Sequence, residues 1–182
     1  IGSDNYAIGQ MAAAYMAEHI PEGGTVGILA GVAQQDAHRQ RVAGFRDYVQ
    51  EHGGLRLAVV TMDAAQYREA ALQTERMIEE HPNLAGLFVT SAIMSLGAVD
   101  TLSAHAAHPV LVGVDTQNDA LRALRDGRMD AIISQDGNDT GRAAIEAVSD
   151  ALAGRTIPAN SYITNALITA ANAQDYLLQE DF

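Results

Sequence analysis

The sequence predicts an α/β fold in which helices cover both faces of a parallel sheet. Apolar runs rich in β-branched residues alternate along the chain with longer segments of helical periodicity, which is the pattern of parallel strands joined by helical crossovers. Two of these runs stop abruptly at polar residues, residues 111–114 at Asp115 and residues 131–134 at Gln135. Hydrophobic residues make up 48% of the 182 positions, which is enough to bury a core.

The first part of the chain predicts two helices separated by a strand. Asp4 is placed to cap a helix over residues 5–20, where apolar side chains recur near helical spacing. A strand over residues 25–30 follows and leads to a helix over residues 35–52 with its own apolar stripe. Gly53-Gly54 is the stop signal of that second helix.

The alternation of strands and helices continues to residue 135. The elements predicted there are a strand over 55–61, a helix over 66–80, a strand over 85–90, a helix over 93–103, a strand ending at Asp115, a helix over 119–125 stopped near Gly127, and a strand over 131–135. Five strands are then joined by four helices, and right-handed crossovers between them predict a flavodoxin-like strand order.

Three further elements are predicted after this unit. They are a helix over residues 140–153, a late strand over 162–169, and a short terminal helix or tail over 172–182.

Composition excludes several functions. The formal net charge of −12 argues against direct contact with nucleic acid, which requires clustered basic residues. The chain has neither lysine nor cysteine, so Schiff bases, thiolate nucleophiles and cysteine-ligated zinc are excluded. No apolar run approaches the roughly 20 residues that a membrane span needs. We expect no catalytic residue, no cofactor and no metal.

Polar residues at the predicted strand ends indicate a ligand site. In an open parallel sheet, ligands bind in the crevice at the carboxyl ends of the strands. Asp115, Gln135 and Ser91 each follow a strand, and Arg41 lies on the helix that follows the strand over residues 25–30. No nucleophile is paired with a base among them, so the pattern indicates a binding site for a small polar molecule.

Each of these residues also has a simpler interpretation. Asp115 could cap the next helix, although Asn118 and Asp119 are better placed for that role. Arg41 could be a solvated helix residue, and Gln135 could satisfy backbone groups without touching a ligand.

A pair of histidines also invites a metal-site interpretation. His105 and His108 offer two ligands, but no third ligand accompanies them, and a solvated helix end is the simpler interpretation.

Several motifs resemble those of one superfamily in their order and spacing. They are Ser3-Asp4-Asn5-Tyr6, Arg39-Gln40-Arg41-Val42-Ala43-Gly44-Phe45, Met94-Ser95-Leu96-Gly97-Ala98, Val112-Gly113-Val114-Asp115 and Leu124-Arg125-Asp126-Gly127. Together they resemble the periplasmic sugar-binding proteins of the ribose/galactose type, whose fold also serves as the effector domain of LacI-type repressors. The resemblance extends over nearly the whole chain.

The resemblance implies one lobe of a two-lobed, type I periplasmic-binding-protein fold. Residues 1–136 would form the ligand-binding C-terminal lobe, and residues 137–182 would be a crossover helix, strand and tail shared with a missing N-terminal lobe. The three crossing segments between lobes would lie near Ile1-Gly2-Ser3, at Gln135-Asp136 and near residues 163–165.

The helix over 140–153 would belong to the other lobe and carry an unpartnered apolar stripe, through which the chain could self-associate. The stripe consists of Ala143, Ala144, Ala147, Val148 and Ala151.

By the same resemblance, Arg41, Asp115 and Gln135 would bind the ligand. The sequence departs from the family pattern where Ser91-Ala92 replaces an Asn-Asp pair, and where an aromatic near Ala65 is lacking. The implied function is an extracytoplasmic, periplasmic protein that closes by a hinge on a sugar-like ligand and delivers it to an ABC transporter or receptor.

Two other function classes compete with this one. The alternative is the effector domain of a LacI-type repressor, which a helix-turn-helix upstream of Ile1 would indicate. A receiver domain with Asp115 as phosphoacceptor would need a lysine that the chain lacks.

Overall fold

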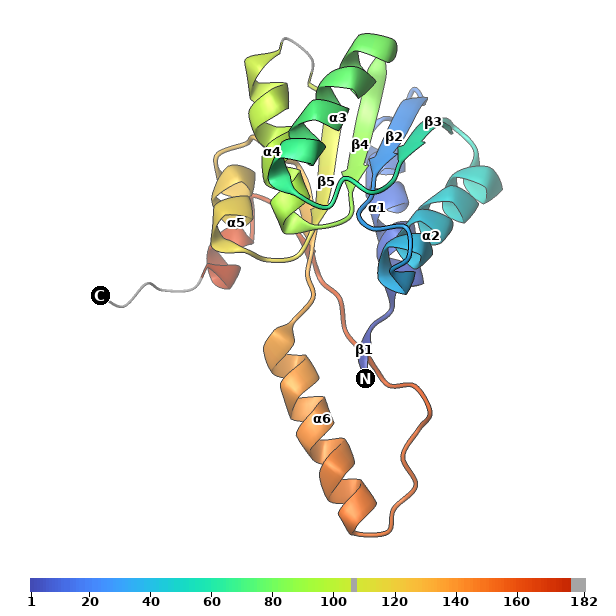
Figure 1. Cartoon of the computed structure of the whole chain (residues 1–182), viewed down its shortest axis with the longest axis vertical. Helices are drawn as coiled ribbons and strands as arrows, with labels where there is room; N and C mark the ends of the chain where they lie inside the picture. The colour runs from blue at the N-terminus through green and yellow to red at the C-terminus, as the bar shows by residue number, and fades with distance from the viewer. Residues whose placement is uncertain (106–107, 178–182) are drawn as a thin grey trace, which may run out of the picture.

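The computed structural model describes residues 1–105 and 108–177, and its body is a sheet with helices on both faces (Figure 1). Within those residues the main sheet has the strand order β3-β2-β4-β5-β6-β8. The strands are β2 (Gly24–Leu29), β3 (Leu55–Thr61), β4 (Leu84–Val89), β5 (Val110–Val114), β6 (Ala131–Ile133) and β8 (Leu167–Ile168). The first five are parallel, which confirms the predicted flavodoxin-like order, and β8 runs antiparallel to β6.

The predicted late strand over 162–169 is wrong as a single element. It divides into β7 (Tyr162–Ile163), which pairs with β1 (Gly2–Ser3), and β8. The break arises because Asn165 and Ala166 hydrogen-bond to Ser134 and turn the chain from one pairing partner to the other.

Strand side chains alternate between the two faces of the sheet, as the period of two requires. Ile28, Phe88 and Val112 pack with helices α1 (Asn5–His19) and α2 (Asp36–His52). Their neighbours Leu29, Leu87 and Leu111 pack on the opposite face. The helices on that face are α3 (Tyr67–Glu80), α4 (Ala92–Ala104) and α5 (Asn118–Arg125). The sheet is thus buried on both sides, which explains its near-continuous apolar strands.

Helices α1 and α2 contact each other through their backbones. A Cβ on Gly9 would lie 2.1 Å from the Arg41 carbonyl oxygen, and one on Gly44 would lie 2.0 Å from that of Tyr6. Only glycine allows this approach. The close contact brings Arg41 against the start of α1, whose predicted cap Asp4 accepts a hydrogen bond from the Ala7 N–H at 3.0 Å.

Helix α6 (Gly137–Leu152) stands apart from the body, and the chain returns from it along residues 153–161 (Figure 1). Asp136 caps it, but none of its residues is buried. Ile145, Val148 and Leu152 are 73%, 60% and 86% exposed. These three residues share one helix face, which we call the α6 apolar face.

The predicted stripe overlaps this face: Val148 belongs to both, and Ala151 is also exposed. Ala143, Ala144 and Ala147 are only partly exposed, whereas the large side chains of Ile145 and Leu152 form the exposed face. The lower exposure of Ala143 is explained by β7, because Ala143 lines a hollow together with Tyr162 and Ile163.

The terminal segment forms a short 3-10 helix over Ala173–Tyr176. Residues 178–182 of the predicted terminal helix or tail lie outside the described residues. Among the helices that the structure describes, none has the length and apolar character needed to cross a membrane.

Candidate functional site

Arg41 is the centre of a polar cluster at the carboxyl edge of the sheet. Its side chain is 5% exposed, so the interpretation as a solvated arginine is wrong. Nε donates to Asn5 Oδ1 at 3.0 Å, Nη1 to the Thr90 carbonyl at 2.5 Å, and Nη2 to Gln135 Oε1 at 2.6 Å. A buried guanidinium is costly unless it is hydrogen-bonded, and here each nitrogen has an acceptor.

Asp115 lies beside Arg41 at the end of β5. Its φ of 77° is left-handed, an uncommon conformation for a residue other than glycine. Burial raises the pKa of the Asp115 carboxyl, while Arg41 and a hydrogen bond from the Ala92 backbone N–H act in the opposite direction. The carboxylate thus faces both a guanidinium and the amino-terminal end of α4, where the helix dipole favours negative charge.

Asp115 does not cap α5. The residue at the N-cap position is Gln117, which makes no side-chain capping bond, and Asn118 and Asp119 lie within the helix. The expectation that one of those two residues is the cap was therefore also wrong. With the capping interpretation removed, the local structure leaves the Asp115 carboxylate directed at the polar cluster.

Ser91 and Gln135 complete the four predicted residues. Ser91 is the N-cap residue of α4 and makes no side-chain capping bond. It lies between Thr90, which binds Arg41, and Ala92, which binds Asp115. Gln135 binds the Arg41 guanidinium rather than a backbone group. The structure thus gathers residues from four separate strand ends or helices at one edge of the sheet.

Three polar residues of the cluster were not predicted from the sequence. Asn5 and Thr90 accept hydrogen bonds from Arg41, and His38 Nδ1 lies 2.8 Å from Thr90 Oγ1. Burial, and secondarily the charge of Arg41, lowers the pKa of His38. Thr90 could have been found from its place at a strand end beside Ser91. His38 carried no such signal, because a histidine in a first helical turn is commonly exposed.

Asn165 links the three segments that were expected to be interlobe crossings. Its Nδ2 donates to Ser3 Oγ at 3.1 Å and to the Ser134 carbonyl at 2.8 Å, and β1 pairs with β7 beside it. Asn5 follows the first of these segments and Gln135 belongs to the second, and both accept hydrogen bonds from Arg41. The three segments are therefore hydrogen-bonded both to one another and to the polar cluster.

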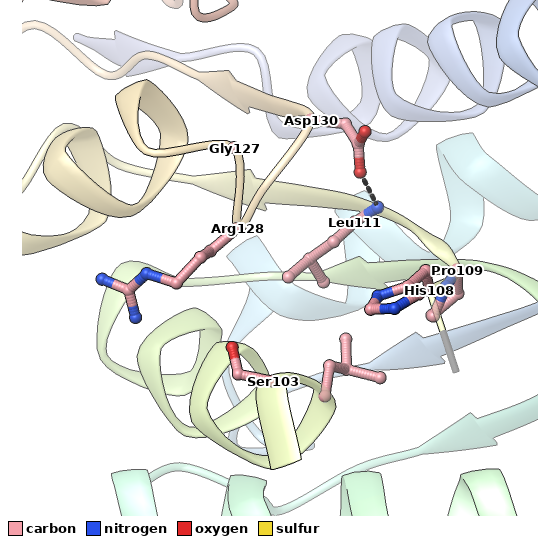
Figure 2. A pocket seen from close by; sticks show the side chains of 8 residues that line it. Ser103, His108, Pro109, Leu111, Gly127, Arg128 and Asp130 are labelled. Carbon is pink, nitrogen blue, oxygen red and sulfur yellow. Dashed lines mark hydrogen bonds between the residues drawn. The ribbon is translucent and has the colours of Figure 1, made fainter. Parts of the chain in front are cut away.

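Two hollows lie near the sheet ends. A cavity of about 340 Å³ adjoins the polar cluster, lined by Thr116, Ser134, Gln135, Asp136, Asn138 and Tyr176 among others. A cavity of about 270 Å³ lies at the opposite, amino-terminal ends of β5 and β6 (Figure 2).

Three polar side chains that line the second cavity, those of Asp130, Arg128 and Ser103, are engaged in structural bonds. Asp130 accepts from the Leu111 N–H at 2.7 Å (Figure 2). Arg128 pairs with Asp100, and the Ser103 hydroxyl donates to the Val99 carbonyl. The polar cluster at the carboxyl edge is therefore the better candidate site. Among the described residues there is no group of three or more acidic, histidine or cysteine side chains placed to hold a metal ion.

The chemistry of the cluster is hydrogen bonding. A carboxylate accepts two hydroxyl protons, and a guanidinium donates in a planar fork. Together with a hydroxyl and an amide, this set suits a small molecule rich in hydroxyl groups. An open parallel sheet with such a cluster at its carboxyl edge belongs to the class of α/β ligand-binding domains.

Comparison with known sequences identifies the family. The family described as "Periplasmic binding protein domain" matches residues 1–156, and the chain belongs to it. The ribose import binding protein RbsB of Bacillus subtilis is 30% identical over 159 residues, which cover 86% of this chain and 51% of that protein. RbsB of Salmonella typhimurium is 31% identical, covering 87% of this chain and 54% of that protein. The chain spans about half the length of these curated relatives.

Solved structures share the fold. A periplasmic solute-binding protein of an ABC transporter from Actinobacillus succinogenes, with bound D-allose, superposes with a TM-score of 0.88 at 24% identity, covering 97% of this chain and 62% of that one. The XylFII–LytSN complex gives a TM-score of 0.84 at 26% identity, covering 94% of this chain and 62% of the other.

Proposed function

We propose that this chain is the ligand-binding lobe of an extracytoplasmic sugar-binding protein that serves an ABC importer. The observation that carries the proposal is the convergence of Asp115 and Gln135 on the buried Arg41, with Ser91 next to Thr90, whose carbonyl also binds Arg41. These four residues are the proposed ligand contacts. The proposal assigns no catalytic residue, cofactor or metal, and no direct contact with nucleic acid.

The relatives support a sugar as the ligand class. Those named above are ribose import proteins, and another relative is the D-allose-binding periplasmic protein of Escherichia coli. Because the two RbsB relatives are named as import binding proteins, they favour transport over the repressor effector domain. A receptor is the second proposed type of partner, since one structural neighbour is the XylFII–LytSN complex.

The proposed lobe boundaries follow the three linked segments. Residues 1–136 form the lobe that carries the polar cluster, and residues 137–182 contribute α6, β7, β8 and the tail, which are shared with an N-terminal lobe. The exposed α6 apolar face supports this division, because it lacks the cover that a second lobe would provide. Ligand contacts from both lobes would stabilise a closed state by hinge closure.

Binding to the complete protein tests the proposal. The complete reading frame that carries this chain would be expressed, and D-ribose, D-allose, D-fructose, polyols and nucleosides would be screened by thermal shift and then calorimetry. We expect one sugar or polyol to bind, and we expect the 182-residue chain alone to bind it at least about 100-fold more weakly, because half of the closing surface is absent.

Two matched pairs of variants locate the site. Arg41→Met and Asp115→Asn should each weaken binding by about tenfold or more, since each removes a charge-assisted hydrogen bond. Arg125→Met and Asp126→Asn alter an exposed ion pair and serve as controls. Unchanged affinity in the first pair would refute the site assignment, and failure of every sugar and polyol to bind would refute the function.

A further inference from the structure

His38 is a titratable residue beside the polar cluster to which the proposed ligand contacts assign no role. It lies in the first turn of α2, three residues before Arg41, so both residues occupy the same helix face. Its ring covers Gly31, where a Cβ would lie 2.4 Å from His38 Nε2. Any side chain at position 31 would therefore displace the His38 ring.

Thr90 connects His38 to Arg41. The Thr90 side chain is fully buried, and its hydroxyl oxygen accepts from the Gly31 N–H at 3.3 Å. The Thr90 carbonyl accepts from Arg41 Nη1, and the Thr90 N–H donates to the Leu29 carbonyl at 3.1 Å. Thr90 thus spans the gap between the end of β2 and the Arg41 guanidinium.

The hydrogen bonds of Thr90 define the tautomer of His38. A buried hydroxyl proton needs an acceptor, and within the described part of the chain the group that takes this role is His38 Nδ1. Nδ1 must then be unprotonated, so the ring is neutral and carries its proton on Nε2. The arrangement around Arg41 therefore depends on a neutral histidine.

Protonation of His38 would disrupt this arrangement in two ways. Nδ1 would become a donor, which leaves the buried Thr90 hydroxyl proton without its acceptor. A second positive charge would also appear beside Arg41, which lies on the same helix.

The nearby acidic groups are already engaged. Asp115 faces Arg41 from β5, and Asp63, after β3, accepts from the Ala33 N–H at 2.8 Å. Asp36, in the first turn of α2, is paired with Arg39 at the surface. None of these three carboxylates is paired with His38, whose pKa is lowered by burial first and by Arg41 second.

We propose that His38 is a positioning residue: in its neutral form it holds Thr90, and through Thr90 the Arg41 guanidinium, in the arrangement that binds ligand. Protonation releases that arrangement. The effect on ligand affinity rests on the proposed function, whereas the effect on Thr90 and Arg41 does not. Because one proton is taken up, affinity falls by at most about tenfold per pH unit below the midpoint of the His38 titration.

The first experiment uses the ligand-free complete protein. NMR would follow the ring C–H signals of His38, assigned with His38→Asn, and the Nε–H signal of Arg41 between pH 5 and 8. We expect His38 to titrate below 6.5, the ordinary value for histidine, and the Arg41 signal to change with the same midpoint. The Arg41 change should vanish in His38→Asn and persist in His52→Asn, a control on the exposed end of the same helix. If the Arg41 Nε–H signal does not change over the pH range in which His38 titrates, the proposal is wrong.

The second experiment measures binding of D-ribose, D-allose and D-fructose by calorimetry over the same pH range. His38→Asn places a non-titrating acceptor where Nδ1 lies, so we expect its affinity at neutral pH to stay within about threefold of the original and its pH profile to be flat. His38→Ala and Gly31→Ala should weaken binding at every pH, because both lose the contact with Thr90. An acid-dependent loss that persists in His38→Asn would refute the positioning role. If no sugar binds at any pH, the proposed function fails and the NMR experiment alone decides the role of His38.

Discussion

The body of the molecule and α6 differ in how many of their apolar side chains are buried within this chain. In the body, large side chains such as Phe45, Phe88 and Ile28 are fully buried, and the two phenylalanine rings stack with centroids 5.4 Å apart. Helix α6 stands apart from the body (Figure 1). None of its residues is buried, and its large apolar side chains are exposed. Helix α6 nevertheless has an N-cap, Asp136, and a regular helical sequence. Local sequence signals therefore determine where a helix forms, but not which surface it packs against.

The largest expected effect compares one isoleucine from each region. Ile28→Ala should lower the free energy of unfolding of the 182-residue chain by about 2–5 kcal/mol, because it leaves a cavity in the core. Ile145→Ala should change it by less than about 0.5 kcal/mol, because Ile145 is 73% exposed. Urea unfolding measures both.

Measuring Ile28→Ala and Ile145→Ala in the complete protein tests whether α6 is packed against a second lobe there. If α6 packs in a second lobe there, Ile145→Ala should become about as costly as Ile28→Ala. If Ile145→Ala lowers the free energy of unfolding equally little in the 182-residue chain and in the complete protein, the proposed lobe boundaries are contradicted.

Self-association of the 182-residue chain is the second expected difference between the regions. Exposed apolar surface tends to be covered, so we expect concentration-dependent dimers through the α6 apolar face in light scattering. Val148→Asp should weaken this association by about tenfold or more, because it buries a charge at the contact. Ser149→Asp, at an exposed position beside that face, is the control. A strictly monomeric chain with a well-ordered, exposed α6 would argue against the lobe assignment.

A smaller effect is expected at the junction between the two regions. Asn165→Ala removes the hydrogen bonds to Ser3 and Ser134, and we expect a loss of about 1–2 kcal/mol in the free energy of unfolding. Because this junction joins the body to α6, amide hydrogen exchange in β1 and β7 should accelerate more than exchange in β2. Uniform acceleration across the sheet would show that Asn165 stabilises the body rather than the junction.

The smallest expected effect is a pH dependence that belongs to the body. The folded-state pKa of Asp115 is raised above its ordinary value of 3.8, so the cost of burying its charge is absent below that value. The cost grows as the pH rises from 3.8 through the folded-state pKa. The stability of Asp115→Asn relative to the original chain should therefore increase over that window and then stay constant, as measured by unfolding at a series of pH values.

Exposed Asp126→Asn serves as the control for this series and should show no such dependence. A relative stability of Asp115→Asn that falls with rising pH would contradict the direction of the pKa shift.

Much of the body could be predicted because its signals are local. Strand and helix alternation predicted the order of the parallel strands, and the side chains at their ends predicted the edge at which Arg41, Ser91, Asp115 and Gln135 meet. Strand periodicity and the rule that parallel strands share a carboxyl edge suffice for such predictions.

The prediction near the end of the chain was wrong where contacts between distant segments determine the secondary structure. The predicted strand over residues 162–169 was divided by the bonds of Asn165 and Ala166 to Ser134, about 30 positions away. No local pattern encodes such a partner. On α6, the partial cover of Ala143 likewise depends on a distant segment, because β7 lies beside it.

By itself the sequence predicted the fold class and the strand order, which depend on periodicity. It also predicted the four candidate ligand residues, because Ser91, Asp115 and Gln135 follow strands and Arg41 lies in a motif that resembles the family. Only the tertiary structure revealed that Arg41 is buried, that Asn5, Thr90 and Gln135 accept its hydrogen bonds, and that His38 Nδ1 lies 2.8 Å from Thr90 Oγ1. The physical reason is that charge burial and hydrogen-bond partnership arise where segments distant in sequence meet. The close approach of α1 and α2 through Gly9 and Gly44 creates that meeting point, and it exists only once the chain has folded.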